Sequence, residues 1–149
     1  MPDTLLVTKV SLPKLRHILV PREKVRRQLS EGVQDEHLLT LVSAPAGYGK
    51  TTTIRMWVEE AGYPVAWVTL ENSDNDLKQF LTYVLTVLGQ AGDDLGQAAL
   101  EVVENTREIN LQRILSLLID DLFDLEQPII LVLDHVHLLT ANRKHKWIP

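Results

Sequence analysis

The sequence predicts an α/β fold in which helices cover a parallel sheet. Three short apolar runs, at residues 38–43, 65–70 and 129–133, have the length and composition of buried strands. Segments with apolar residues at helical spacing separate these runs, and such alternation is typical of βαβ units. A chain of 149 residues can bury, on folding, about 70% of the surface that it exposes when unfolded. It therefore needs no disulfide or metal to support a core.

The first predicted elements lead into a glycine-containing loop. Residues 1–21 contain three prolines and are predicted to be irregular and extended. Apolar spacing predicts a short helix from Arg22 to about Ser30. The strand at 38–43 then ends at the loop, and a helix should run from Lys50 to Ala61, where Gly62 ends it.

Strands and helices also alternate in the second half of the chain. After the strand at 65–70, a helix begins at Leu77, and its candidate N-caps are Asp74, Asn75 and Asp76. A loop is predicted where three glycines follow that helix: Gly89, Gly92 and Gly96. A further helix should span 111–125 behind an Asn110 cap, before the strand at 129–133 that ends at Asp134.

Composition excludes several classes of function. Without cysteine, the chain has no disulfide framework, no thiolate zinc site and no thiol nucleophile. No apolar run approaches the roughly 20 residues that span a bilayer. The N-terminus has no signal-peptide pattern, so we expect a cytoplasmic protein without membrane contact.

The net charge of −5 is unevenly distributed along the chain. Residues 1–30 carry seven Lys/Arg and two acids, whereas residues 59–126 carry three Lys/Arg and fourteen acids. We expect the basic side chains of the first segment to be solvated: Lys9, Lys14, Arg16, Lys24, Arg26 and Arg27. The acidic middle repels a phosphate backbone, so no direct DNA contact is expected from this chain.

The loop after the first strand carries the chemistry. Residues 44–51 fit the phosphate-binding pattern G-x-x-x-x-G-K-[ST] (Walker A), except that Ala44 replaces its first glycine. Glycines allow the backbone N–H groups to turn toward a phosphate, Lys50 can reach the outer phosphates, and the Thr51 hydroxyl can bind Mg²⁺. The sequence therefore predicts an ATP/ADP site at Ala44, Pro45, Ala46, Gly47, Tyr48, Gly49, Lys50, Thr51 and Thr52.

A phosphate-binding loop predicts a second half-site, a carboxylate at the end of another apolar strand that also reaches Mg²⁺. Asp134, after the strand at 129–133, is the candidate. Many ATPases place an acid next, to orient or deprotonate the attacking water, but here the position holds His135. Nucleotide binding is therefore a firmer prediction than hydrolysis, which we expect to be weak or absent.

Taken together, these motifs resemble the N-terminal ATPase domain of MalT-type, LuxR-family transcriptional regulators, which are STAND P-loop NTPases. The resemblance runs from about Leu5 to Leu139. The segments that carry it are Thr8–Val10, Pro13 with Arg16, Leu19–Arg22, Leu39–Thr52, Pro64–Leu70, Asp74–Asp76, Phe80–Leu81, and Leu131–Asp134 with His137. It implies a three-layer P-loop NTPase fold with a parallel sheet.

The resemblance also implies a function. Members of this family are nucleotide-gated switches with an ADP-bound resting state, an ATP-bound state that self-associates, and slow hydrolysis for resetting. In the family pattern Arg22 would lie against the adenine and phosphates, although an ordinary surface arginine fits the sequence equally well. Self-association, or pairing with a full-length regulator, is the implied partnership.

The chain departs from the family in length and strand number. We expect a basic lead-in with a short helix (1–36), a nucleotide-binding core (37–139) and a basic tail (140–149). With only three strands visible, the sheet should be incomplete and the chain a truncated or fragmentary regulator. Two alternatives remain: a small independent P-loop kinase or NTPase, with Arg107 and Arg113 as candidate catalytic arginines, and a non-catalytic interaction module that pairs through an open sheet edge.

Overall fold

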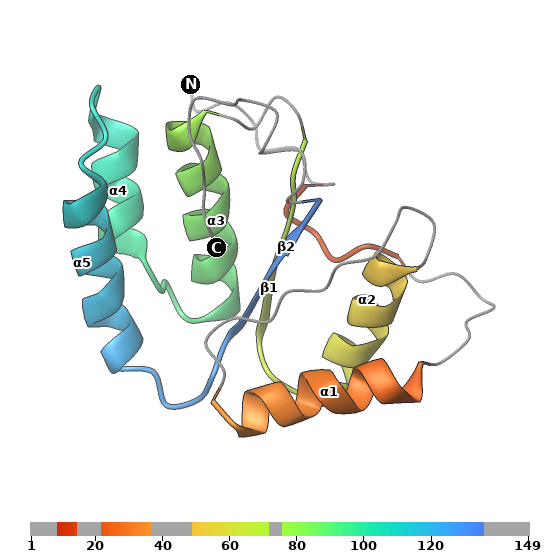
Figure 1. Ribbon diagram of the computed structural model, residues 1–149. Helices are drawn as coiled ribbons and strands as arrows, with labels where there is room; N and C mark the ends of the chain where they lie inside the picture. The colour runs from red at the N-terminus through yellow and green to blue at the C-terminus, as the bar shows by residue number, and fades with distance from the viewer. Residues whose placement is uncertain (1–8, 15–21, 37–48, 72–75, 136–149) are drawn as a thin grey trace. The chain divides into compact units, whose positions relative to one another are not determined.

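The computed structural model describes residues 9–14, 22–36, 49–71 and 76–135 (Figure 1). The chain divides into two compact units. The first unit comprises Met1–Ser11 and Tyr63–Pro149, and the second comprises Leu12–Gly62. Each unit has its own helices and its own buried side chains, and each is described in turn.

The first unit contains a parallel pair of strands, β1 (Val65–Thr69) and β2 (Ile130–Asp134). Val65 pairs with Ile130 and Thr69 with Asp134, so the carboxyl ends of both strands lie at one edge. Three helices connect them along the chain: α3 (Leu77–Ala91), α4 (Gln97–Asn105) and α5 (Leu111–Phe123). The parallel sheet and the strand–helix alternation confirm the α/β prediction.

The helices of this unit form successive layers. α3 packs on β1, α4 packs on α3, and α5 packs on α4, as Figure 1 shows. One buried cluster joins the sheet to α3: Ala66, Val68, Leu70, Tyr83, Val84, Val87, Leu88 and Leu95. A second joins the three helices: Leu81, Leu85, Ala99, Val103 and Ile114. The core of the unit therefore lies on both sides of α3.

The described residues of the second unit form two helices, α1 (Glu23–Gln34) and α2 (Lys50–Ala61). Leu29 of α1 and Trp57 and Val58 of α2 are buried in it. The Trp57 indole N–H donates to the Ser30 hydroxyl at 2.9 Å, which links the two helices by a polar contact inside an apolar seam.

The element boundaries agree with the sequence in part. α2 has the bounds predicted for it, and Gly62 ends it in the left-handed conformation. α1 continues to Gln34, beyond the expected end near Ser30, and α5 ends at Phe123. The strand predicted at 38–43 lies outside the described residues, as does the basic tail.

The prediction of a loop around the three glycines was wrong in two respects. Gly89 lies inside α3, and Gly96 is the N-cap of α4, a helix that the sequence analysis did not predict. The Gly96 backbone N–H donates to the Asp121 carboxylate of α5 at 2.8 Å. A tertiary contact from a side chain 25 residues away therefore supports a helix start that has no side-chain cap of its own.

Candidate functional site

The predicted phosphate-binding loop ends at a helix start. Gly49 is the N-cap of α2 with a φ of +73°, a left-handed conformation that costs residues with a side chain free energy. Its carbonyl accepts the first helical hydrogen bond, from the Thr53 N–H at 2.9 Å. Lys50, Thr51 and Thr52 are the first three residues of α2, whereas Ala44–Tyr48 lie outside the described residues.

This geometry suits an anion. The first backbone N–H groups of a helix have no partners within the helix, and the helix dipole places partial positive charge at the same end. Lys50 adds a full positive charge there. The start of α2 therefore combines three features that favour a phosphate group: the N–H groups of a first helical turn, the dipole and an ammonium group.

Arg22 lies beside Gly49. It is the N-cap of α1, it is exposed, and its Nη2 atom is 3.8 Å from the position that a Cβ on Gly49 would occupy. The sequence suggested Arg22 only through the family resemblance. The structure brings its guanidinium next to Gly49, the glycine that precedes Lys50 in the sequence.

Asp134 and His135 lie in the first unit, at the carboxyl edge of the sheet. Asp134 is the last residue of β2, and its side chain is 14% exposed. Its Oδ1 accepts from the His135 backbone N–H at 3.0 Å, and its carbonyl accepts from the Leu70 N–H at 3.0 Å. These bonds fix the backbone and orientation of the carboxylate.

His135 follows in an unusual conformation. Its φ is +62°, which is rare for a residue with a side chain and turns the chain sharply after the strand. The imidazole Nε2 is 3.9 Å from the Asp134 Oδ1, and the side chain is half exposed. The imidazole of His135 therefore lies near the Asp134 carboxylate at the end of the strand and is accessible to solvent.

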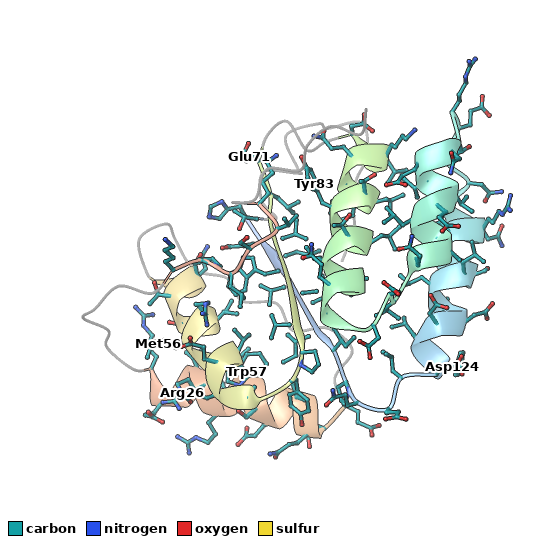
Figure 2. All side chains as sticks on the ribbon, turned by 180° about the vertical axis from the view of Figure 1, so that it is seen from behind. Arg26, Met56, Trp57, Glu71, Tyr83 and Asp124 are labelled. Carbon is teal, nitrogen blue, oxygen red and sulfur yellow. The ribbon has the colours of Figure 1, made fainter. Side chains whose placement is uncertain are left out.

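The expectation that Lys9 is solvated was wrong. Its side chain is 4% exposed, and its Nζ lies 3.5 Å from the Glu71 Oε2 and 5.0 Å from the centroid of the Tyr83 ring (Figure 2, where Glu71 and Tyr83 are labelled). The Lys9 carbonyl accepts from the Thr69 N–H at 3.0 Å. The charge is buried because a carboxylate and an aromatic face compensate for its lost hydration.

Sequence reasoning missed this cluster because its members are far apart along the chain. Lys9 precedes the first strand, Glu71 follows β1, and Tyr83 lies in α3. The only available signal was that Thr8–Val10 belongs to the family resemblance. The contact attaches the start of the chain to the carboxyl end of β1, the strand beside Asp134.

An open groove of about 470 Å³ lies between α1 and α2. It is lined by Glu23, Arg26, Arg27, Ser30, Trp57, Glu60 and Ala61. Arg26 pairs there with Glu23 and with Glu60, so its charge is neutralised within the protein. Because Glu60 and Ala61 lie at the opposite end of α2 from Lys50, this groove is distinct from the predicted phosphate site.

Within the described part of the chain, no three His, Asp or Glu side chains gather as a metal cluster. The expected Mg²⁺ site does not need such a cluster, because Mg²⁺ in nucleotide sites takes one or two protein oxygens together with phosphates and water. The donors offered by Thr51 and Asp134 are hard oxygen ligands of this kind. In the same part of the chain, no helix is long and apolar enough to cross a bilayer.

Comparison with known proteins supports the α/β reading. Residues 33–147 match the family described as AAA domain, which is about three quarters of the chain. The chain belongs to the AAA domain family. Its fold is accordingly that of the P-loop NTPases.

The similar proteins identify the kind of regulator that this chain resembles. The chain is 32% identical over 136 residues to the HTH-type transcriptional regulator MalT of Klebsiella pneumoniae, and 30% identical over 142 residues to MalT of Yersinia pestis. The matches cover 91% and 95% of this chain but 15% of each relative. The predicted resemblance to MalT-type regulators is confirmed, and this AAA domain spans about 15% of the length of the regulators it matches.

Proposed function

We propose that this chain is the ATP/ADP-binding segment of a STAND-type, LuxR-family transcriptional regulator. The loop Ala44–Thr52 would hold the phosphates of the nucleotide, with Lys50 at the β- and γ-phosphates. The observation that carries this proposal is the start of α2, where a left-handed Gly49 is followed at once by Lys50 and Thr51. Membership of the AAA domain family supports it, because such domains generally bind nucleotides.

Arg22 has a part in the same proposal. The Arg22 guanidinium, with Nη2 3.8 Å from where a Cβ on Gly49 would lie, could donate hydrogen bonds to a phosphate in the loop or stack on the base. Because the side chain is exposed, it would keep its charge hydrated until the nucleotide arrives. We therefore assign Arg22 to nucleotide binding.

Mg²⁺ would be held by the Thr51 hydroxyl and by Asp134. When bound, the ion supplies neutralisation of phosphate charge. The backbone N–H of His135 donates to Oδ1 of Asp134 and so orients the carboxylate that would bind the ion or one of its waters. The position of Asp134 at the carboxyl end of β2, paired with β1, supports this assignment.

Hydrolysis would be weak or absent. A carboxylate next to the metal-binding aspartate can take a proton from water, and the chain has His135 there instead. The half-exposed imidazole could accept a proton. The left-handed backbone of His135, however, fixes the direction in which the side chain leaves the strand end. The segment would therefore serve as a switch that distinguishes ATP from ADP, in the cytoplasm, and self-association in the ATP state would be its output.

Thermal unfolding with and without Mg-ADP tests the proposal. A ligand at 100 times its dissociation constant adds about 2.7 kcal/mol, and at about 2–4 °C for each kcal/mol Tm should rise by roughly 5–10 °C. Lys50→Ala should remove most of this shift. The matched control is Lys24→Ala, which removes an exposed lysine from α1.

Two results would contradict the assignment. An unchanged Mg-ADP shift in Lys50→Ala would show that the nucleotide binds elsewhere. The absence of any shift in the wild-type chain, with either ADP or ATP, would leave the non-catalytic interaction module as the better hypothesis. Phosphate release measured with ATP would separately test the expectation of slow or absent turnover.

A further inference from the structure

α5 is apolar on two sides. One side is buried against the other helices through Ile114, with Leu111, Leu117 and Leu118 packed around the same cluster. The other side carries four large apolar residues that are exposed to solvent: Leu115, Ile119, Leu122 and Phe123. A helix that is apolar on both sides is typical of a buried position, and a single packed face would be enough for a surface helix.

The exposed residues form one continuous stripe, which we call the α5 stripe. They follow the spacing i, i+4, i+7 and i+8, so they lie along one side of the helix. Leu115, Ile119 and Leu122 are 42–48% exposed, and Phe123 is 85% exposed. A phenylalanine left almost entirely in water at the end of such a stripe is the pattern of an aromatic anchor for a partner.

Charge around the stripe is negative. Residues 111–126 contain four carboxylates, Asp120, Asp121, Asp124 and Glu126, against the single base Arg113. Asp124, labelled in Figure 2, follows the last turn of α5 directly after Phe123. The Asp121 carboxylate accepts from the Gly96 N–H, whereas Asp120, Asp124 and Glu126 are exposed.

This charge discriminates between occupants. A second copy of the chain that met the first stripe to stripe would bring an equal net charge of −3 (one base minus four acids) against it, which disfavours a symmetric contact. An anionic membrane surface would be repelled for the same reason. A helix with an apolar stripe bordered by Lys or Arg would meet both the apolar residues and the acids with complementary groups.

We propose that the α5 stripe is a docking surface for a basic amphipathic helix of another protein. Phe123 and Ile119 would enter between the apolar side chains of that helix, and Asp120 and Asp124 would pair with its basic border. The proposal is independent of nucleotide binding, because none of its residues belongs to the phosphate loop.

The probes are two labelled helical peptides of about 18 residues, one built from Leu and Lys and the other from Leu and Glu with the same apolar stripe. Fluorescence anisotropy with the full chain measures their binding. We expect the Leu/Lys peptide to bind at least about tenfold more tightly than the Leu/Glu peptide, a difference of about 1.4 kcal/mol. Its affinity should fall as the salt concentration rises from about 50 to 300 mM.

Variants locate the binding. Ile119→Ser with Phe123→Ser should weaken the Leu/Lys peptide at least about tenfold, while Tm stays near the wild-type value because both side chains are exposed. Leu77→Ser is the matched control, since Leu77 is an exposed leucine of α3 outside the stripe. Asp120→Lys with Asp124→Lys keeps the stripe and should reverse the preference toward the Leu/Glu peptide.

Three outcomes would overturn the proposal. Equal binding of both peptides would remove the role of charge. An equal loss of binding in Leu77→Ser and in the stripe variant would place the peptide elsewhere. Failure of both peptides to bind, with a dimer in sedimentation that the stripe variant abolishes, would assign the surface to a second copy of this chain.

Discussion

Replacement of Gly49 by alanine tests the backbone geometry on which the nucleotide proposal depends. At a φ of +73°, a residue with a Cβ loses about 1–2 kcal/mol, and the reduced freedom of the unfolded chain returns about 0.4–1 kcal/mol. The new Cβ would meet the Arg22 Nη2 at 3.8 Å, an ordinary contact that adds no clash. The free energy of unfolding should therefore fall by about 1 kcal/mol, or about 2–4 °C in Tm.

α2 offers a matched control at its other end. Gly62 has a φ of +75°, and a Cβ there would meet nothing within 4 Å. Gly62→Ala should consequently lose about as much stability as Gly49→Ala, since the strain is of the same kind. A difference between the two variants in the nucleotide-dependent shift in Tm would then be caused by the loop that ends at Gly49 and not by loss of helix stability.

The assay is thermal unfolding of both variants with and without Mg-ADP. We expect Gly62→Ala to keep the nucleotide-dependent rise in Tm and Gly49→Ala to lose more than about half of it, because the strain of a left-handed alanine favours conformations in which the N–H groups turn away from a phosphate. A full nucleotide shift in Gly49→Ala would refute the role of this glycine. A large difference in Tm without nucleotide would refute the conformational argument itself.

Three further substitutions test the first unit. Lys9→Met should cost about 1 kcal/mol in urea unfolding, because the methionine still fills the site while the cation–π contact with Tyr83 and a partly exposed ion pair with Glu71 are lost. A loss above about 3 kcal/mol would contradict this. Asp76→Ala should cost about 1 kcal/mol by removing the N-cap of α3, and an Asn replacement should recover it. Ile114→Ala should cost about 2–4 kcal/mol in the same measurement, because this side chain is fully buried. Leu115→Ala, one residue later, should cost much less because Leu115 is exposed. Equal losses would show that α5 packs on a different face.

Local signals predicted the elements whose ends are fixed by local chemistry. α2 begins and ends at left-handed glycines, so its bounds could be read directly. α3 and α5 begin behind Asp76 and Asn110, each of which accepts a hydrogen bond from a backbone N–H in the first turn. α4 has no such cap, and its start depends on Asp121 from another helix, which no local pattern reveals.

The candidate site shows the same division. The position of Lys50 and Thr51 at the start of a helix follows from the loop motif itself. The approach of Arg22 to Gly49 joins residues 27 positions apart, and only the family resemblance suggested it. The burial of Lys9 depends on Glu71 and Tyr83, whose proximity exists only after the sheet and α3 have formed, so a count of charges treated Lys9 as a surface lysine.

The register of the sheet has a consequence for the growing chain. Each residue of β1 pairs with one that lies 65 positions later, as Val65 does with Ile130. At a synthesis rate of about 5–20 residues per second, β1 would leave the ribosome about 3–13 s before its partner in β2. During this interval α3, which packs on β1, would be available to cover the apolar face of the strand, and this helix can form from local contacts while translation continues.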